Sequence, residues 1–267
     1  CWVVALASQF IGAAQLALRW FPGVPIWVFA SIFAILVFGL NMLSVGWFAT
    51  AEDYFSSIKF YAILVFILLG LLAVFGLLPY KGSSSAPLFS NLTANGLFPN
   101  KFVGLISVML SVNYAFSGVE MIGIAAGETD NPKQAVPKAI KSTIGLLVTF
   151  FCMTMLVLAS LLPMDQAGVV EAPFVTVFEK IGIPYAADIM NFVILTAILS
   201  ASTSGLYASS RMLWSLANEG MISKNVVKIN KHGVPMRAMF LSMIGVIVAL
   251  VAGRVSTWPS RGLRRWW

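Results

Sequence analysis

A long apolar stretch from Phe102 to Ala126 contains four residues that a simple membrane anchor would avoid: Asn113, Ser117, Gly118 and Glu120. The stretch is long enough to cross a bilayer as a helix, for which about 20 apolar residues suffice. A carboxylate within it costs roughly 2.5–3.5 kcal/mol at mid-membrane, and a Ser-Gly pair is a common point at which helices kink. Opened backbone at that depth persists only where it lines a cavity or is buried by protein. We therefore interpret this segment as half of a solute-binding site.

A purely structural explanation of the same residues stays open. The stretch could be a kinked helix that only packs, with the Glu120 carboxylate bonded to a neighbour. Glu120 itself could respond to pH or act as a structural acceptor, and the sequence does not choose between these. Transporters, however, bind small solutes with the half-helix ends and carbonyls of interrupted helices. This precedent favours the binding-site interpretation.

The composition indicates a membrane protein. Of the 267 residues, 59% are hydrophobic and 10% are charged, whereas globular domains carry about 25% charged residues. A single soluble core could not bury that much apolar surface, so we expect lipid around much of the chain. Cys1 and Cys152 lie in apolar runs, and His232 is the one histidine. No catalytic residues, metal site, disulfide framework or cofactor are therefore indicated, and an enzyme is not expected.

The apolar runs predict an all-α polytopic protein with about seven transmembrane helices, near residues 1–18, 26–48, 58–78, 102–126, 142–162, 189–216 and 236–252. Polar connections are expected at 49–57, 79–100 and 129–141. Between 164 and 185, Pro173 precedes Phe174, Val177, Phe178 and Ile181 at helical spacing. This pattern predicts a short amphipathic helix that either covers the outer mouth of a site or rests at the interface.

Basic residues divide between the two sets of alternating connections and so predict an orientation. The denser set comprises Lys59, Lys133, Lys138, Lys141, Lys224, Lys228, Lys231 and Arg237, and the sparser set Arg19, Lys81, Lys101 and Lys180. By the positive-inside rule, the denser set faces the cytoplasm. The excess positive charge, formally +7, is thereby explained without a nucleic-acid partner.

The two ends of the chain suggest a fragment. The sequence opens inside an apolar run at Cys1, and beyond Gly253 the apolar pattern stops. Four arginines of the tail, Arg254, Arg261, Arg264 and Arg265, would lie outside. We predict a partial transmembrane domain at 1–252 and an aberrant or truncated tail at 253–267. Truncation or a shifted reading frame near Gly253 would explain this tail. Nucleotides that encode no continuing apolar helices in another frame would refute that hypothesis.

Three stretches resemble the amino acid permeases of the amino acid–polyamine–organocation superfamily: FATAEDYFSSIK at 48–59, FSGVEMIGIAAGETDNPKQAVPKAI at 116–140 and NFVILTAILSASTSGLYASSRMLWSLANEG at 191–220. The run QAGVVEAPFVTVFEKIGIPYAADIMNF at 166–192 is similar to the S-methylmethionine permease branch. The resemblance covers residues 1–252. It implies an incomplete LeuT-like inverted-repeat transporter fold, with the seven spans as the third to ninth helices of a twelve-helix parent.

The resemblance also implies a substrate site. Carbonyls around Tyr114, Phe116 and Ser117, continuing through Gly118 and Val119, would accept the α-amino group of the substrate. Tyr114 would be an aromatic gate with cation–π energy of roughly 0.5–2 kcal/mol, or would simply pack. On the first span, Trp2 and Leu6 would face the pocket.

The same resemblance implies residues for ion coupling. Lys59 matches the lysine that occupies the space of a sodium ion in sodium-independent members, where a buried amine can release and regain a proton. Alternatively, Lys59 lies one turn from a cytoplasmic helix end and extends to the surface. Ser200, Thr203 and Ser204 would face this region, or would bond their own helix backbone. Glu120 is the second candidate for proton coupling.

The sequence thus predicts secondary active uptake of an amino acid across the cytoplasmic (inner) membrane, and S-methylmethionine is the candidate substrate. Protons are the expected coupling ion, and the lipid bilayer the expected surroundings. A non-transporting remnant, or a membrane subunit that senses amino acids, is the alternative.

Overall fold

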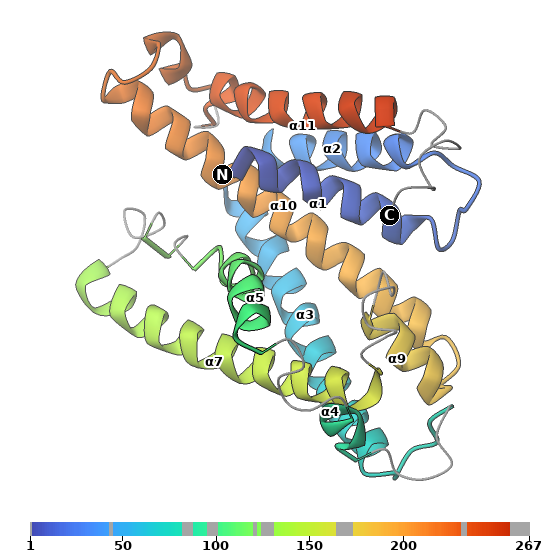
Figure 1. The fold of residues 1–267 in the computed structure, drawn as a ribbon. Helices are drawn as coiled ribbons and strands as arrows, with labels where there is room; N and C mark the ends of the chain where they lie inside the picture. The colour runs from blue at the N-terminus through green and yellow to red at the C-terminus, as the bar shows by residue number, and fades with distance from the viewer. Residues whose placement is uncertain are drawn as a thin grey trace. The chain divides into compact units, whose positions relative to one another are not determined.

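The computed structural model describes residues 2–42, 45–81, 88–94, 101–119, 122–123, 131–163, 173–230 and 234–256. All regular structure in these ranges is helical (Figure 1). The elements are α1 (Trp2–Ala17), α2 (Ile26–Met42), α3 (Val45–Val74), α4 (Ser90–Thr93), α5 (Lys101–Ala115), α7 (Pro132–Leu161), α9 (Pro173–Ile181), α10 (Ala186–Asn218), the 3₁₀ turn η2 (Lys224–Val227) and α11 (Met236–Ser256).

The chain forms two compact units, and each is described by itself. Unit 1 consists of Cys1–Lys59 and Phe192–Trp267, and unit 2 consists of Phe60–Asn191. The long helices α3 and α10 contribute residues to both units.

Each predicted span corresponds to an apolar helix. Within the described part of the chain, three helices could cross a membrane by length and composition: Tyr54–Val74, Pro132–Leu161 and Ala186–Asn218. The other predicted spans correspond to the shorter apolar helices Val4–Ala17, Ile26–Met42, Phe102–Asn113 and Met236–Val248. The predicted all-α class is confirmed for the described residues, while the number of crossings and the LeuT-like arrangement stay predictions. The last helix continues to Ser256, past the domain end predicted at 252, and residues 257–267 lie outside the described part.

Two of the predicted polar connections are wrong, because both are helical. Residues 49–57 belong to α3, which begins at Val45. The segment 49–57 contains helix formers such as alanine and glutamate and lacks glycine and proline, so its polar side chains do not prevent the helix from running through it. Residues 132–141 belong to α7, whose first residue is Pro132. Proline suits the first turn because its missing N–H would have no partner inside the helix.

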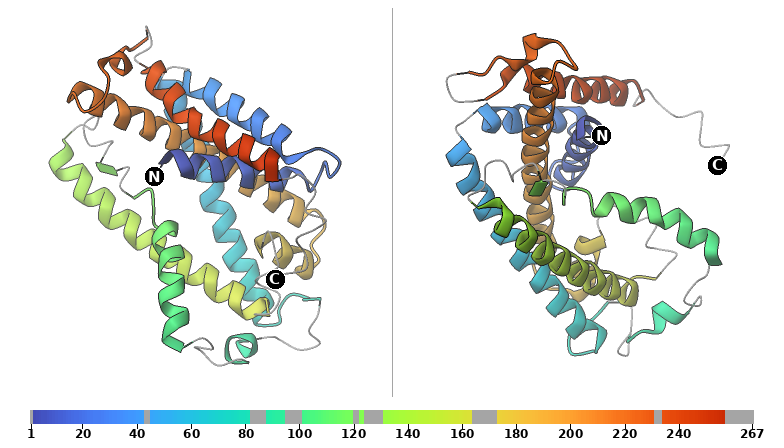
Figure 2. Two further views of the ribbon diagram at one scale, coloured as in Figure 1. Left: turned by 45° about the horizontal axis from the view of Figure 1, so that its top comes forward. Right: turned by 90° about the vertical axis from the view of Figure 1, so that its left-hand side faces the viewer.

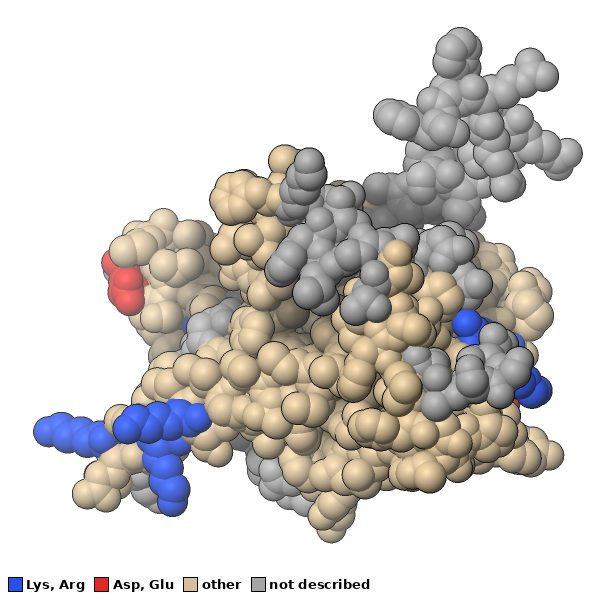
Figure 3. Space-filling view, turned by 60° about the horizontal axis from the view of Figure 1, so that its bottom comes forward, with Lys and Arg blue, Asp and Glu red and all other residues tan. Residues whose placement is uncertain are grey.

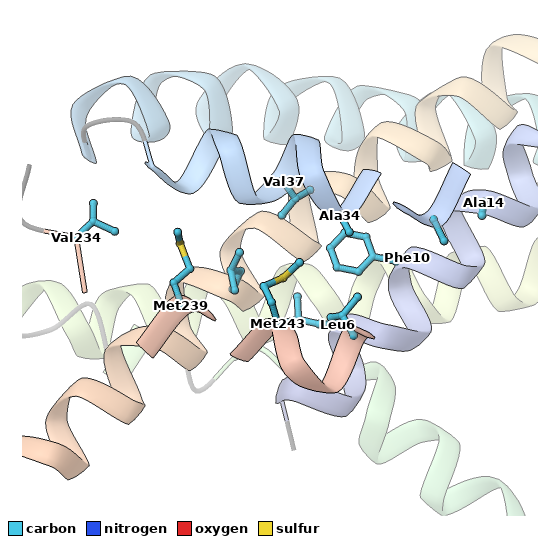
Figure 4. Packing of buried hydrophobic residues seen from close by; sticks show 11 residues of the cluster. Leu6, Phe10, Ala14, Ala34, Val37, Val234, Met239 and Met243 are labelled. Carbon is cyan, nitrogen blue, oxygen red and sulfur yellow. The ribbon is translucent and has the colours of Figure 1, made fainter. Parts of the chain in front are cut away.

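The core of unit 1 lies where α1, α2, α10 and α11 meet. In both views of Figure 2, α1, α2 and α11 lie side by side. Figure 4 shows their side chains between the helices, and the fully or almost fully buried members are Leu6, Phe10, Ala14, Ala30, Ala34, Val37, Leu206, Val234, Met239, Met243 and Val246. Alanines at the contacts allow the helices to approach closely. This cluster gives unit 1 a defined arrangement of its four helices.

Unit 2 combines packed and exposed helices. Helix α3 packs against α7 where Gly70 meets Val157, and the ring of Phe66 contacts the rings of Phe174 and Phe178 on α9. The predicted amphipathic helix is confirmed as α9, which buries Val175, Val177, Phe178 and Ile181. Its predicted place over an outer mouth stays a prediction.

Helix α5 is exposed along most of its length. Its apolar side chains are exposed along its length: Phe102, Val103, Leu105, Ile106, Val108, Met109 and Val112. The face drawn in Figure 3 is likewise almost free of charged side chains over its described surface, with Lys and Arg at its edges. Both features suit a chain whose surroundings are lipid.

Candidate functional site

The regular helix stops where the sequence predicts an interruption. Helix α5 ends at Ala115, and residues 116–119 form turns. The Phe116 N–H donates to the Val112 carbonyl at 3.2 Å, and Gly118 has a φ of 106°. That φ is accessible to glycine but strained for residues with a Cβ. The regular helix therefore ends within the stretch where the sequence predicts a break, while the exposure of its carbonyls to a solute stays a prediction.

The break is packed on one side by α7 and open on the other. The ring of Phe116 contacts the ring of Phe151, with centroids 5.1 Å apart and planes at 62°. Ser117 is exposed, and an added Cβ at Gly118 would meet no atom within 4 Å. The contact between Phe116 and Phe151 packs the start of the break against α7.

Lys59 and Ser200 meet in unit 1. The Lys59 amine donates a hydrogen bond of 2.8 Å to the Ser200 hydroxyl, across 141 residues of sequence. Ser200 is buried and Lys59 is half-buried. The two residues join α3 to α10, the helices that the resemblance placed around an ion site.

The position of Lys59 within α3 differs from the expectation. Because α3 begins at Val45, Lys59 follows about four helical turns of the same helix. It also lies inside the candidate span Tyr54–Val74. The expected position one turn from a helix end is therefore wrong. An amine at this depth in an apolar helix needs a polar partner, which Ser200 supplies.

The other hydroxyls of α10 bond their own helix. Thr203 donates to the Leu199 carbonyl at 2.8 Å, and Ser204 donates to the Ser200 carbonyl at 3.3 Å. Of the three predicted residues, Ser200 is therefore the one whose hydroxyl is shown to accept a hydrogen bond from the Lys59 amine. Further along α10, the Arg211 guanidinium lies over the Tyr207 ring, 4.9 Å from the ring centroid.

The remaining predicted site residues lie elsewhere or outside the described part. Leu6 is fully buried in the core of unit 1, so its present contacts are with other side chains. Trp2 begins α1 and Tyr114 lies near the end of α5, and the side chains of both are outside the described part. Glu120 is outside it entirely. The break at 116–119 belongs to unit 2, and the Lys59–Ser200 pair to unit 1.

Two of the polar contacts that join elements of unit 1 were not predicted from the sequence. The buried Ser209 hydroxyl donates to the Ser242 hydroxyl at 2.6 Å and so links α10 to α11. The indole N–H of Trp214 donates to the Val227 carbonyl at 3.1 Å. The only sequence feature that could have indicated the Ser209–Ser242 bond is a serine within each apolar helix, and this feature does not show which residue is the partner.

Comparison with known proteins identifies the family. The amino acid permease family model matches residues 1–258, and the chain belongs to this family. Its members are membrane transporters rather than enzymes.

Three curated relatives show the range of the similarity. The chain is 47% identical over 250 residues to the amino-acid permease RocE of Bacillus subtilis, covering 94% of this chain and 54% of RocE. It is 39% identical over 253 residues to the gamma-aminobutyric acid permease of the same organism, covering 92% and 53%. It is 35% identical over 252 residues to the lysine-specific permease LysP of Escherichia coli, covering 91% and 51%. The chain spans about half the length of the curated relatives it matches.

Proposed function

We propose that this protein takes part in the uptake of an amino acid across the cytoplasmic membrane by secondary active transport. The observation that carries the proposal is the end of α5 at Ala115, followed by Gly118 at a φ of 106°. Carbonyls released from a helix ladder can replace the water around an α-ammonium group, as in transporters with interrupted helices. Membership of the amino acid permease family supports the class of substrate.

The coupling ion proposed is the proton, and Lys59 is its proposed carrier. The bond from the Lys59 amine to the Ser200 hydroxyl supports this role, because it ties a titratable group to a second helix. In the charged state the amine donates three hydrogen bonds, and after proton loss it donates two and gains an acceptor. Proton release would therefore weaken or rearrange the link between α3 and α10 during transport.

We propose that the substrate is an amino acid, and the individual amino acid is to be identified by testing. S-Methylmethionine, which the sequence resemblance implies, stays a candidate. The names of two relatives add gamma-aminobutyric acid and lysine to the solutes to be tested.

The test is uptake of labelled amino acids into proteoliposomes that contain the chain, with an imposed pH gradient. We expect concentrative uptake that an uncoupler abolishes, and we expect Lys59→Met to remove the response to the gradient while solute binding persists. Lys141→Met, at an exposed lysine on α7, is the matched control and should leave uptake unchanged.

Three outcomes separate the alternatives. Uptake that persists with the uncoupler and in Lys59→Met would contradict proton coupling. Binding without flux would indicate an amino-acid-sensing subunit, and the absence of both would indicate a non-transporting remnant.

A further inference from the structure

The N-terminal part of α7 carries three lysines without an acidic residue on the same helix. Lys133, Lys138 and Lys141 are exposed, and α7 has no acidic residue from Pro132 to Leu161. Within the described part of the chain, none of the three amines forms a hydrogen bond or an ion pair. Like charges three residues apart, such as Lys138 and Lys141, repel one another on a helix. An anion bound between these two amines would offset the repulsion.

An uncharged surface continues from these two lysines along α7. Positions 138, 141, 145, 148 and 152 follow one another at intervals of three or four residues, so they lie on one side of the helix. Gly145, Val148 and Cys152 are exposed. From Lys141 to Cys152 the helix rises about 16 Å, close to the ~15 Å of hydrocarbon in one leaflet. The stripe of five residues therefore joins a basic end to an apolar surface about as long as one acyl chain.

Helix α3 packs on a different side of α7 and leaves this stripe uncovered. The ring of Phe60 on α3 contacts the ring of Phe150 on α7, with centroids 5.2 Å apart. Phe150 lies two residues from both Val148 and Cys152, which places it roughly opposite them on a helix of 3.6 residues per turn. The contact with α3 and the exposed stripe thus lie on different faces of α7.

Gly145 provides open space beside the lysines. An added Cβ at this position would meet no atom within 4 Å, and Gly145 follows Lys141 by one helical turn. Glycine is a poor helix former, so the missing side chain has a cost for the helix. An acyl chain packed into the space would supply the apolar contact that the helix itself lacks there.

We propose that Lys138 and Lys141 bind the phosphate of an anionic phospholipid, whose acyl chain lies along Gly145, Val148 and Cys152. The positive-inside rule places the two lysines at the cytoplasmic leaflet, whose anionic lipids attract basic residues near the surface. A zwitterionic phospholipid has similar acyl chains without the net charge, so it should bind more weakly. The lipid site does not depend on the proposed transport function, and substitutions in it should leave uptake unchanged.

Quenching of a fluorophore by brominated lipids tests the site. Cys1→Ser leaves Cys152 as the single cysteine, and a small fluorophore attached there reports acyl chains at the far end of the stripe. The purified chain in a neutral detergent is titrated with phosphatidylglycerol or with phosphatidylcholine, each brominated on its acyl chains.

Three variants separate charge from shape. Lys138→Gln combined with Lys141→Gln removes both amines of the site. Lys81→Gln combined with Lys228→Gln removes the same charge at two exposed lysines outside α7 and is the matched control. Gly145→Leu keeps both amines but fills the open space.

We expect phosphatidylglycerol to quench at a roughly tenfold lower concentration than phosphatidylcholine, as for two lysines near an anionic surface. The double substitution at 138 and 141 should remove this preference, and the control pair should retain it. Gly145→Leu should weaken quenching by both lipids. In wild type, added salt should reduce the preference, because salt screens charges at an exposed site.

Other results would overturn the inference. Equal quenching of wild type by the two lipids would do so, as would an equal loss of preference in both double variants, since net charge alone would then attract the lipid. Unchanged quenching in Gly145→Leu would show that the acyl chain does not lie along the stripe. Displacement of phosphatidylglycerol by an equal concentration of inorganic phosphate would indicate a site for free anions. None of these results bears on the proposed transport function, because the fluorophore reports lipid alone.

Discussion

At the scale of residues, two side chains complete the C-terminal end of α7. The Tyr80 hydroxyl donates to the Leu161 carbonyl at 2.6 Å, and the Asn91 amide donates to the Ser160 carbonyl at 2.7 Å. The last four carbonyls of a helix have no donor within it, and Ser160 and Leu161 are fully buried. The segment between α3 and α5 therefore supplies the donors that this helix end lacks.

Replacing Tyr80 tests this contribution. We expect Tyr80→Phe to lower the free energy of unfolding by about 1–2 kcal/mol, because the buried Leu161 carbonyl loses its donor. Thermal unfolding in detergent is the measurement. Tyr61→Phe, at an exposed tyrosine, is the control and should have little effect. Equal effects of the two substitutions would contradict the role of the bond.

The same bond should depend on pH. Burial raises the pKa of Tyr80 from 10.0 to about 12. A group whose pKa is raised by folding contributes its full stability below the unfolded-state value and loses it as pH rises through the folded-state value. The difference in unfolding temperature between wild type and Tyr80→Phe should therefore be constant below pH 10 and shrink between pH 10 and about 12. A difference that stays constant to pH 12 would contradict this assignment.

At the scale of elements, a single glycine sets the close contact of α3 with α7. A Cβ at Gly70 would collide with the Cγ1 of Val157. Both residues are buried within unit 2, and a β-branched side chain such as valine has little freedom to move aside on a helix. The approach of the two helices thus requires a residue without a side chain at position 70.

A pair of substitutions tests this complementarity. We expect Gly70→Ala to destabilise the protein by about 1–3 kcal/mol through overpacking, and we expect Val157→Ala, added to it, to recover part of that loss. Gly145→Ala on α7, where nothing lies within 4 Å of the added Cβ, should be neutral or slightly stabilising. Strictly additive effects of Gly70→Ala and Val157→Ala on the unfolding temperature would argue against a direct contact.

At the scale of the whole molecule, the loop charges and the apolar helices predict one orientation. Lys133, Lys138 and Lys141 are exposed in the N-terminal part of α7, and Lys81 is exposed after the end of α3. The positive-inside rule assigns the three lysines of α7 to the cytoplasm and Lys81 to the opposite side.

Labelling with a membrane-impermeant maleimide tests the orientation. In a background with Cys1 and Cys152 replaced by serine, we expect Lys81→Cys to react in intact cells. Lys138→Cys should react only after the membrane is permeabilised. The reverse pattern would show that the chain has the opposite orientation, and labelling of both cysteines in intact cells would contradict a single fixed one.

The sequence by itself determined the helical class, the approximate helix positions, the amphipathic α9 and the break after Ala115. These features depend on local properties: runs of apolar residues, their spacing, and the backbone freedom of Gly118. The starts of α3 and α7 were harder to predict, because polar segments with good helix formers or an N-terminal proline are compatible with both loop and helix.

Only the tertiary structure decided which polar side chains meet. The partnership of Lys59 with Ser200 spans 141 residues, and no local pattern distinguishes Ser200 from Thr203 or Ser204. The open space beside Gly145 is equally invisible in sequence, because exposure depends on how neighbouring helices pack around α7. Local chemistry determines where helices form, whereas their packing determines which polar groups find partners.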